Sequence, residues 1–378
     1  MNLENNAFQS LIDLQEVCLL QRIPFVSYRL PLEIDITTLV QHSSMPEKMD
    51  SSFIPDKTSG FVMAPFFETE KRGAYILKPD QVFISNNIDK RYIQTLKENS
   101  RFISIIQPTE NEISTTASAD FIQQVENAKL AIAGGNLHKV VLSKVRNEKL
   151  RDDFNVSRLF LELCKLYPHA FVYLIQLPQV GCWVGATPEP LLVITGKKVK
   201  TVSLAGTQVA TDADIDSYLW SQKEIEEQGI VTAYVEQTLQ SLSIKNYTKA
   251  GPYNYKAANL IHLKTSFEFA QVGLESHFGE FLKAFHPTPS VGGLPKEAAR
   301  EFIFKHEKHD RAYYSGFLGP VNIKGESNVF VNLRCLQLLE KHFVLYSGAG
   351  ITASSDAEKE WVETDNKMMT MLNVMNNL

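Results

Sequence analysis

The chain has 378 residues, with 38 lysines and arginines against 43 aspartates and glutamates, for a net charge of −5. This balance argues against a dedicated nucleic-acid-binding protein, which usually carries a basic excess or stripe. No run approaches the roughly 20 apolar residues that cross a membrane, and the acidic start of the chain lacks the basic-then-apolar layout of a signal peptide. We therefore expect a globular protein without nucleic-acid or membrane partners.

The first hundred residues predict short strands from apolar runs at 23–28, 60–65 and 81–84. Between the first two runs, the polar stretch 42–60 predicts a long loop, and a second polar stretch, 107–120, has the composition of a linker. We accordingly divide the chain into a variable N-terminal part, residues 1–114, and a main region, residues 115–378.

The main region alternates helical and extended patterns. Helical spacing over 121–132 is followed by a glycine pair, then by a predicted strand at 139–145, a helix at 156–167 and a strand at 171–177. Three further runs predict a meander of strands: 183–187, 191–195 and 199–204.

The last part of the chain predicts a long helix over 214–242, a helix over 296–306 that starts after Pro295, and a hairpin of strands 329–339 and 342–346. A capping-box pattern at 355–358 opens the final helix. Strands joined by hairpins and interrupted by helices favour a layered, mostly antiparallel α/β fold over a Rossmann fold. The Gly348–Gly350 segment is no dinucleotide motif, because position 353 is Ala353.

Four isolated cysteines form no CxxC pair and have no histidine at metal-ligand spacing: Cys18, Cys164, Cys182 and Cys335. We expect buried, reduced thiols and a cytoplasmic protein.

Two predicted helices carry glutamates three residues apart, so each pair shares a helix face. The pairs are Glu224 with Glu227 and Glu360 with Glu363, and Lys367 extends the second face by one turn. Carboxylates from two elements, with open positions for substrate oxygens, suit Mg²⁺. The alternative is a pair of solvated helix faces.

Two further residues suggest acid–base chemistry. Lys139 begins an apolar strand, where burial would disfavour its charged form and let it act as a base, unless it points to water from an edge strand. Glu189 lies in a tight break between two strands, where a carboxyl group can keep its proton and donate it; the alternative is an ordinary turn glutamate.

Anion-binding candidates complete the set. Arg334 lies among apolar residues of a predicted strand and suits carboxylate recognition, or a structural ion pair. His262 is more typical of a hydrogen-bonded core histidine than of a catalyst. The segments around Gly206–Thr207 and Gly348 allow close approach of backbone N–H groups to an anion, or are simple turns. From the residues alone, we expect a magnesium enzyme acting on a small polycarboxylate.

Eight motifs follow one another along the main region: KVVLSK (139–144), GATPE (185–189), LAGT (204–207), IHL (261–263), HPTPSVGG (286–293), LRC (333–335), SGAGI (347–351) and EWVETDNK (360–367). This series resembles the chorismate-utilising enzymes, and within them the isochorismate synthases of menaquinone and siderophore pathways. The resemblance covers about residues 115–378. It implies a single large α/β domain, with antiparallel sheets around a deep site and helices outside.

The resemblance also implies roles for individual residues. It makes Lys139 the general base and Glu189 the general acid, and it gives the magnesium ligands as Glu227 and Glu363. Glu224 and Glu360 would lie nearby as water-mediated partners.

For substrate binding, the resemblance implies that Arg334 holds the enolpyruvyl carboxylate with the backbone at Gly348. Lys367, Gly206 and Thr207 would complete anion binding, and His262 would lie near the substrate ring. The chain departs from the family pattern at Gln228, where a histidine is frequent, and at Ser290–Val291, where alanine is the commoner first residue.

The implied reaction is the reversible, Mg²⁺-dependent conversion of chorismate to isochorismate, by water attack at ring carbon 2 and loss of the hydroxyl at carbon 4. The chain would act as a monomer without an obligatory amidotransferase partner. Salicylate synthases and aminating anthranilate or aminodeoxychorismate synthases are alternatives, as is a non-catalytic carboxylate sensor. The lysine at position 139 argues against the aminating branch, and retention of all presumed catalytic groups argues against the sensor.

Overall fold

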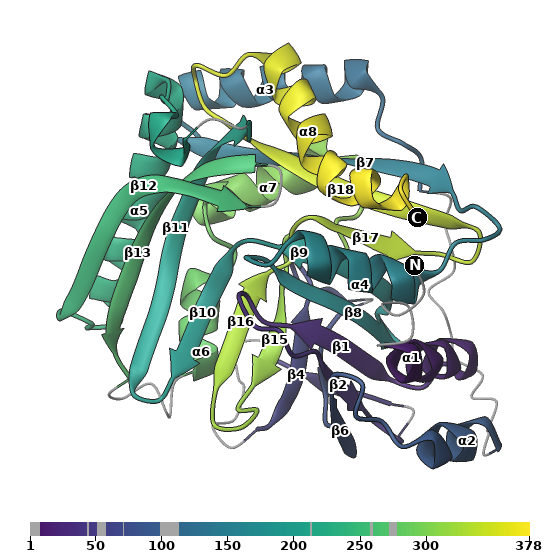
Figure 1. Ribbon diagram of the computed structural model, residues 1–378. Coiled ribbons are helices and arrows are strands. Elements are labelled where there is room, and N and C mark those ends of the chain that lie inside the picture. Colours follow the sequence, from purple (N-terminus) through teal and green to yellow (C-terminus); the bar gives the residue numbers. More distant parts are fainter. Residues whose placement is uncertain are drawn as a thin grey trace.

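The computed structural model describes residues 8–43, 45–50, 58–70, 72–98, 113–211, 214–257, 260–271 and 278–378. Two nine-stranded sheets organise these residues, and all of their recorded strand pairs are antiparallel (Figure 1). The predicted fold class, a single domain of layered antiparallel sheets with helices outside, is confirmed. Each of the four cysteines is a free thiol, and Cys164 is only half-buried, contrary to the expectation of burial.

The first sheet contains, in spatial order, β14 (Gly293–Leu294), β7 (Lys139–Lys149), β18 (His342–Ile351), β17 (Cys335–Leu338), β9 (Gly181–Thr187), β8 (Phe171–Leu177), β1 (Phe25–Arg29), β2 (Thr37–Val40) and β6 (Gln81–Ile84). Its central strands are long and buried, because their sequences are nearly continuous apolar runs.

The second sheet contains β12 (Tyr247–Ala257), β13 (Leu260–Ala270), β11 (Lys198–Val209), β10 (Pro190–Thr195), β16 (Ser327–Val331), β15 (Phe317–Val321), β4 (Gly60–Ala64), β5 (Ala74–Leu77) and β3 (Glu47–Met49). The short strand β3 lies inside the stretch 42–60, so the prediction of one long loop was wrong there; residues 44 and 51–57 of that stretch lie outside the described residues.

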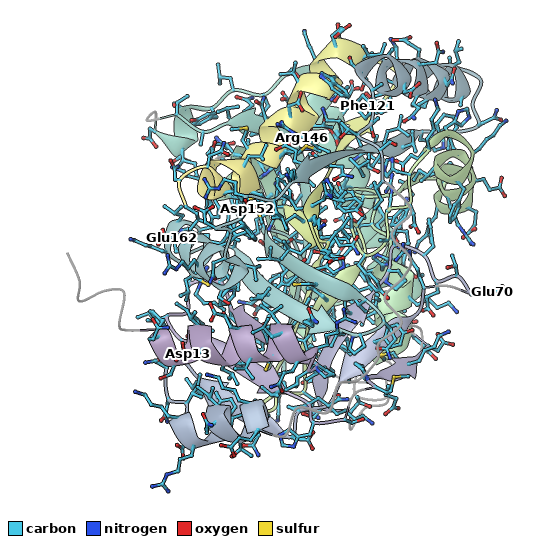
Figure 2. The ribbon with its side chains drawn as sticks, turned by 90° about the vertical axis from the view of Figure 1, so that its right-hand side faces the viewer. Asp13, Glu70, Phe121, Arg146, Asp152 and Glu162 are labelled. Carbon is cyan, nitrogen blue, oxygen red and sulfur yellow. The ribbon has the colours of Figure 1, made fainter. Side chains whose placement is uncertain are left out.

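The helices are α1 (Gln9–Gln21), α2 (Lys90–Glu98), α3 (Ser118–Ala133), α4 (Val156–Leu166), α5 (Gln222–Ser241), α6 (Phe278–Phe285), α7 (Lys296–His306) and α8 (Ala357–Met375). Figure 2 shows α1, with Asp13, at the opposite end of the molecule from α3, with Phe121. Helix α5 packs on β11 and α8 packs on β18, so the two glutamate-bearing helices cover strands of different sheets. No helix among the described residues is long and apolar enough to cross a membrane.

Helix α5 is shorter than predicted. It begins at Gln222 and not near residue 214, and a single 3₁₀ turn, Ile215–Ser217, precedes it. Ser221 and Glu224 form a capping box that fixes the start of the helix and satisfies backbone N–H groups of its first turn. The helical periodicity did not reveal this start.

The chain changes sheets at two places, once within the predicted meander and once within a stretch predicted as a single strand. The predicted meander is wrong because β9 belongs to the first sheet while β10 and β11 belong to the second, with Glu189 at the crossing. The predicted strand 329–339 is likewise two strands, β16 and β17, in different sheets. Arg334, between them, has a φ of 49°, a left-handed conformation that breaks the extended chain.

These two crossings lie side by side. The N–H of Ala186 donates to the carbonyl of Arg334 at 3.0 Å, and the N–H of Val331 donates to the carbonyl of Glu189 at 2.9 Å. The backbone thus places two charged side chains at the junction of the sheets.

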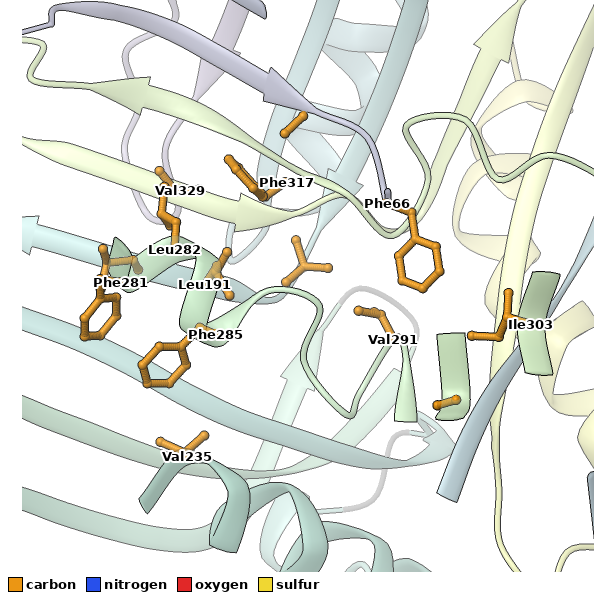
Figure 3. Packing of buried hydrophobic residues seen from close by; sticks show 14 of the residues in the cluster. Phe66, Leu191, Val235, Phe281, Leu282, Phe285, Val291, Ile303, Phe317 and Val329 are labelled. Atoms are coloured by element: carbon orange, nitrogen blue, oxygen red, sulfur yellow. The ribbon is translucent and has the colours of Figure 1, made fainter. Parts of the chain in front are cut away.

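A large apolar cluster supports this junction from α5, α6 and the second sheet. Figure 3 shows Phe281 and Phe285 of α6 close to Val235 of α5, with Leu191 of β10 and Val291 in the same cluster. The rings of Phe281 and Phe285 stack with centroids 4.5 Å apart. The core therefore holds the strands and loops around the junction in fixed positions.

Candidate active site

Lys139 begins strand β7 and is completely buried, so the alternative of a solvent-facing edge lysine is wrong. Its ammonium nitrogen forms an ion pair with Oε1 of Glu227 on α5, at 2.8 Å. It has no other polar partner among the residues that the structure describes. Gly350 of β18 makes room for this pair: a Cβ there would lie 2.3 Å from Oε1 of Glu227 and 3.0 Å from Cε of Lys139. The segment Gly348–Gly350 thus belongs to strand β18 and is not a turn.

Glu189 is buried at the first sheet crossing, with 4 % of its surface exposed. Burial raises the pKa of its carboxyl group to about 7, although the nearby charges of Lys139 and Arg334 favour the ionised form. A carboxyl group with this pKa is substantially protonated near neutral pH. The site therefore contains a proton donor.

His262 on β13 links two predicted binding elements. Its Nδ1 lies 2.7 Å from the carbonyl oxygen of Gly206 and must donate to it, because a carbonyl can only accept. Its Nε2 lies 3.4 Å from a guanidinium nitrogen of Arg334 and is therefore the acceptor. Burial lowers the pKa of His262 to about 3, so the ring is neutral, and burial lowers the pKa of Arg334 to about 10, which leaves the guanidinium charged.

Helix α8 presents two carboxylates with different partners. Oε1 of Glu360 lies 2.7 Å from Nζ of Lys223 on α5, and Oε1 of Glu363 lies 2.7 Å from Nζ of Lys367. Burial and the charge of Glu363 raise the pKa of Glu360. For Glu363, burial is outweighed by Lys367 and Lys223, which lower its pKa. Lys367 also donates to the carbonyl of Gly348 at 2.9 Å, which ties α8 to β18.

The remaining candidates have local contacts. Glu224 accepts a hydrogen bond from the N–H of Ser221 at 2.7 Å, as the third residue of its capping box. Thr207 lies 3.5 Å from Nδ1 of His262 through its hydroxyl oxygen. The water-mediated role of Glu224 and the anion-binding role of Thr207 stay predictions.

The carboxylates suit a hard cation in their chemistry. Glu360 is 2 % exposed, and its Oε2 has no hydrogen-bond partner among the described residues. Among all the residues that the structure describes, no group of three aspartate, glutamate, histidine or cysteine side chains is arranged to hold a metal. Any ion bound here would take further ligands from substrate or water, as Mg²⁺ commonly does.

Comparison with known proteins decides the family. The model for chorismate-binding enzymes matches residues 58–376. The chain belongs to the chorismate-binding enzyme family. Isochorismate synthase EntC of Escherichia coli K12 is 27 % identical over 344 residues, covering 88 % of this chain and 86 % of EntC. The vibriobactin-specific isochorismate synthase of Vibrio cholerae is 26 % identical over 287 residues, covering 74 % and 73 % of the two chains.

The fold of this chorismate-binding enzyme resembles a solved relative over almost its whole length. The crystal structure of MenF, the menaquinone-specific isochorismate synthase of Escherichia coli, superposes with a TM-score of 0.74 at 21 % identity, covering 95 % of this chain and 91 % of MenF. This similarity includes the N-terminal part of the chain, which the sequence motifs did not cover.

A cavity of about 340 Å³ opens beside the buried groups of this chorismate-binding enzyme, and Thr207 and Glu363 are among its lining residues. Its size suits a small ligand. A larger cavity, of about 510 Å³, is lined by residues such as Leu19, Phe154 and Leu338, and contains none of the candidate residues. The larger of these two cavities therefore does not coincide with the candidate site.

Three contacts of this site were not predicted. Lys223 lies four residues before Glu227, and this helical spacing could have placed it on the same face. A Cβ at Gly348 would lie 3.0 Å from the hydroxyl of Tyr314, which no local pattern indicates. Ser290, known only as a departure from the family pattern, donates to the carbonyl of Leu204 at 2.9 Å.

The other departure has a structural explanation. Gln228 is buried behind Glu227 and donates through its amide nitrogen to the hydroxyls of Ser203 and Thr265, each at 3.1 Å. It joins α5 to β11 and β13.

Proposed function

We propose that the protein is an isochorismate synthase that interconverts chorismate and isochorismate with Mg²⁺. The observation that carries the proposal is that two buried acid–base groups lie close enough to interact: a carboxyl with a pKa of about 7, Glu189, and a lysine, Lys139, whose charge acts on it. Family membership and relatives named isochorismate synthases support the same reaction.

In this proposal Lys139, in its neutral form, accepts a proton from a water molecule that attacks ring carbon 2. Glu189 donates its proton to the hydroxyl that leaves carbon 4 as water, and the ring double bonds shift between the two carbons. One water is consumed and one released, so the reaction is an isomerisation. In the reverse direction the two residues exchange roles.

Arg334 supplies the positive charge for a substrate carboxylate, and His262 orients the guanidinium of Arg334. The neutral imidazole accepts from the guanidinium while it is anchored to Gly206. A guanidinium held by a fixed neighbour presents its remaining N–H groups in a defined direction, which suits two-point carboxylate binding. Lys367, Gly348, Gly206 and Thr207 would line the rest of the anion site.

Glu227 and Glu363 would hold the magnesium ion, with Glu224 and Glu360 nearby. Bound there, Mg²⁺ would neutralise a carboxylate of the substrate and lower the energy of charge that develops in the ring. The unpaired Oε2 of Glu360 supports a site that accepts more positive charge.

We further propose that the enzyme acts as a cytoplasmic monomer without an amidotransferase partner. It would supply isochorismate to menaquinone or siderophore synthesis. Residues 1–114 would be the variable N-terminal part of the fold and residues 115–378 the chorismate-binding catalytic region.

One incubation tests the reaction. Purified protein is mixed with chorismate and Mg²⁺, with and without ammonium, and the products are separated by chromatography; Glu189→Gln serves as the matched inactive control. We expect isochorismate as the main product, approaching the same ratio from either direction. Equal amounts of salicylate and pyruvate as dominant products would make the protein a salicylate synthase, and an aminated product would place it in the aminating branch.

A further inference from the structure

Lys223 lies where the two glutamate-bearing helices meet. It projects from the first turn of α5, and its ammonium group lies 2.7 Å from Oε1 of Glu360 on α8. Both side chains are largely shielded, with 20 % of the lysine and 3 % of the glutamate exposed. Lys223 therefore links the two halves of the proposed metal site directly.

The carboxylates at this junction are matched one to one with lysines. Glu227 pairs with Lys139, and Glu363 pairs with Lys367. The remaining pair, Lys223 with Glu360, includes a lysine that the proposed reaction leaves without a role. Burial would lower the pKa of Lys223, but the charges of Glu360, Glu227 and Glu363 together raise it. All three carboxylates thus stabilise the charged form of its ammonium group.

A lysine and a divalent cation satisfy such a cluster in different ways. One ammonium charge offsets the repulsion between buried carboxylates, but Oε2 of Glu360 is left without a hydrogen-bond partner among the described residues. A divalent ion accepts several oxygens at once and brings a second positive charge. A cation bound at these carboxylates would repel the ammonium group of Lys223 beside Glu360, the one lysine of the three that the proposed reaction does not use.

We propose that Lys223 is an internal counter-ion, which holds the carboxylate cluster together without metal and is displaced from Glu360 when the divalent cation binds. This inference rests on the magnesium site of the proposed function. The flexible four-carbon stem and the partial exposure of Lys223 give the ammonium group a path to solvent. The lysine would weaken metal binding, and it would keep buried like charges from destabilising the empty site.

The proposal predicts how removal of the lysine changes metal affinity. Mn²⁺ is titrated into the purified protein, and free Mn²⁺ is followed by electron paramagnetic resonance, with and without an equilibrated chorismate–isochorismate mixture. We expect Lys223→Met to bind Mn²⁺ at least about fivefold more tightly than the unaltered protein, the lower end of typical coupling between sites. In chelator its melting temperature should fall, and Mn²⁺ should restore it.

Two further variants separate competition from a loss of charge or of folding. Lys223→Gln removes the charge and keeps a hydrogen-bond donor for Glu360, so it should fold and still bind Mn²⁺ more tightly. Lys249→Met removes another lysine paired with α5, through Glu236 at 3.0 Å, and should leave the affinity unchanged. Unchanged or weaker Mn²⁺ binding in both Lys223 variants would overturn the counter-ion inference and leave the proposed metal site standing. Absence of Mn²⁺ binding by the unaltered protein would overturn the metal site as well.

Discussion

The buried charged clusters around Glu307 and around Lys139 and Glu227 differ in how fully their polar atoms are paired among the described residues. Around Glu307, the carboxylate accepts from the N–H and hydroxyl of Ser143 and from two nitrogens of Arg311. Arg311 also donates to the carbonyls of Val141 and Val291, and its guanidinium lies 4.3 Å from the ring centre of Phe66. This cluster fastens β7 to the loop before β14.

The cluster around Lys139 and Glu227 lacks this completeness. Apart from the ion pair with Glu227 at 2.8 Å, the ammonium of Lys139 has no polar partner among the described residues, and Oε2 of Glu360 has no hydrogen-bond partner there. The direction of the pKa shifts follows the same division: the charge of Arg311 outweighs burial and lowers the pKa of Glu307, whereas burial prevails at Glu189 and raises its pKa. In this comparison, incompletely satisfied buried charge, and not buried charge by itself, distinguishes the candidate site from the Glu307 cluster.

The largest expected effect follows from removing a metal ligand. Glu227→Gln or Glu363→Gln should lower turnover by on the order of 10³-fold or more, because several kcal/mol of charge stabilisation would be lost. Initial rates against Mg²⁺ concentration measure the effect, and circular dichroism checks the fold. Full activity in excess chelator would contradict the assignment.

Removal of the acid or the base should have the next largest effect. Lys139→Met and Glu189→Gln keep the side-chain size, and each should lower kcat by about 10²- to 10⁴-fold, the usual contribution of a general acid or base. Rates on chorismate and on isochorismate should fall together. A loss of less than about tenfold in both variants would mean that other residues carry the proton transfers.

A substitution in the fully paired cluster around Glu307 should change the stability of the protein and not its catalytic chemistry. Arg311→Met leaves the buried carboxylate of Glu307 without its main partner, and should cost about 3 to 5 kcal/mol of unfolding free energy in urea titrations. Lys308→Met is the matched control, because its ion pair with Asp120 is mostly exposed and should contribute about 1 kcal/mol or less. Equal losses in the two variants would remove the distinction between the clusters.

The smallest expected effect is on pH dependence. Glu189 has a pKa near 4.5 when unfolded and about 7 when folded. The folded state therefore binds its proton more tightly, and this residue lowers stability progressively as pH rises from about 4.5 to 7. Glu189→Gln should exceed the unaltered protein in stability by on the order of 3 kcal/mol above pH 7 and should match it below about pH 4.5.

Activity should fall in the same pH range. kcat/KM should decrease above about pH 7, as Glu189 loses the proton that it must donate. A rate that stays constant up to pH 9 would rule out this carboxyl as the acid. The stability comparison separates titration of Glu189 from titration of the substrate.

The sequence by itself determined much of the local structure and the chemical groups of the site. Apolar periodicity and cap residues place most of the helices and strands of the main region, because these signals depend on neighbours along the chain. The strand at Lys139 begins where predicted, whereas the final helix begins one residue later than the predicted capping box at 355–358 implies, because Asp356 and not Ser355 is its N-cap and accepts from the N–H of Lys359. The motif series also identified the family.

Tertiary structure alone decided how these groups meet. The predicted meander near Glu189 and the predicted single strand near Arg334 each cross between sheets, because pairing with distant strands outweighs local preference. The pairing of Lys223 with Glu360 joins residues 137 positions apart, and no local pattern encodes it. The pKa of Glu189 was likewise settled by burial at the junction, since desolvation depends on everything packed around the group and not on its neighbours in the chain.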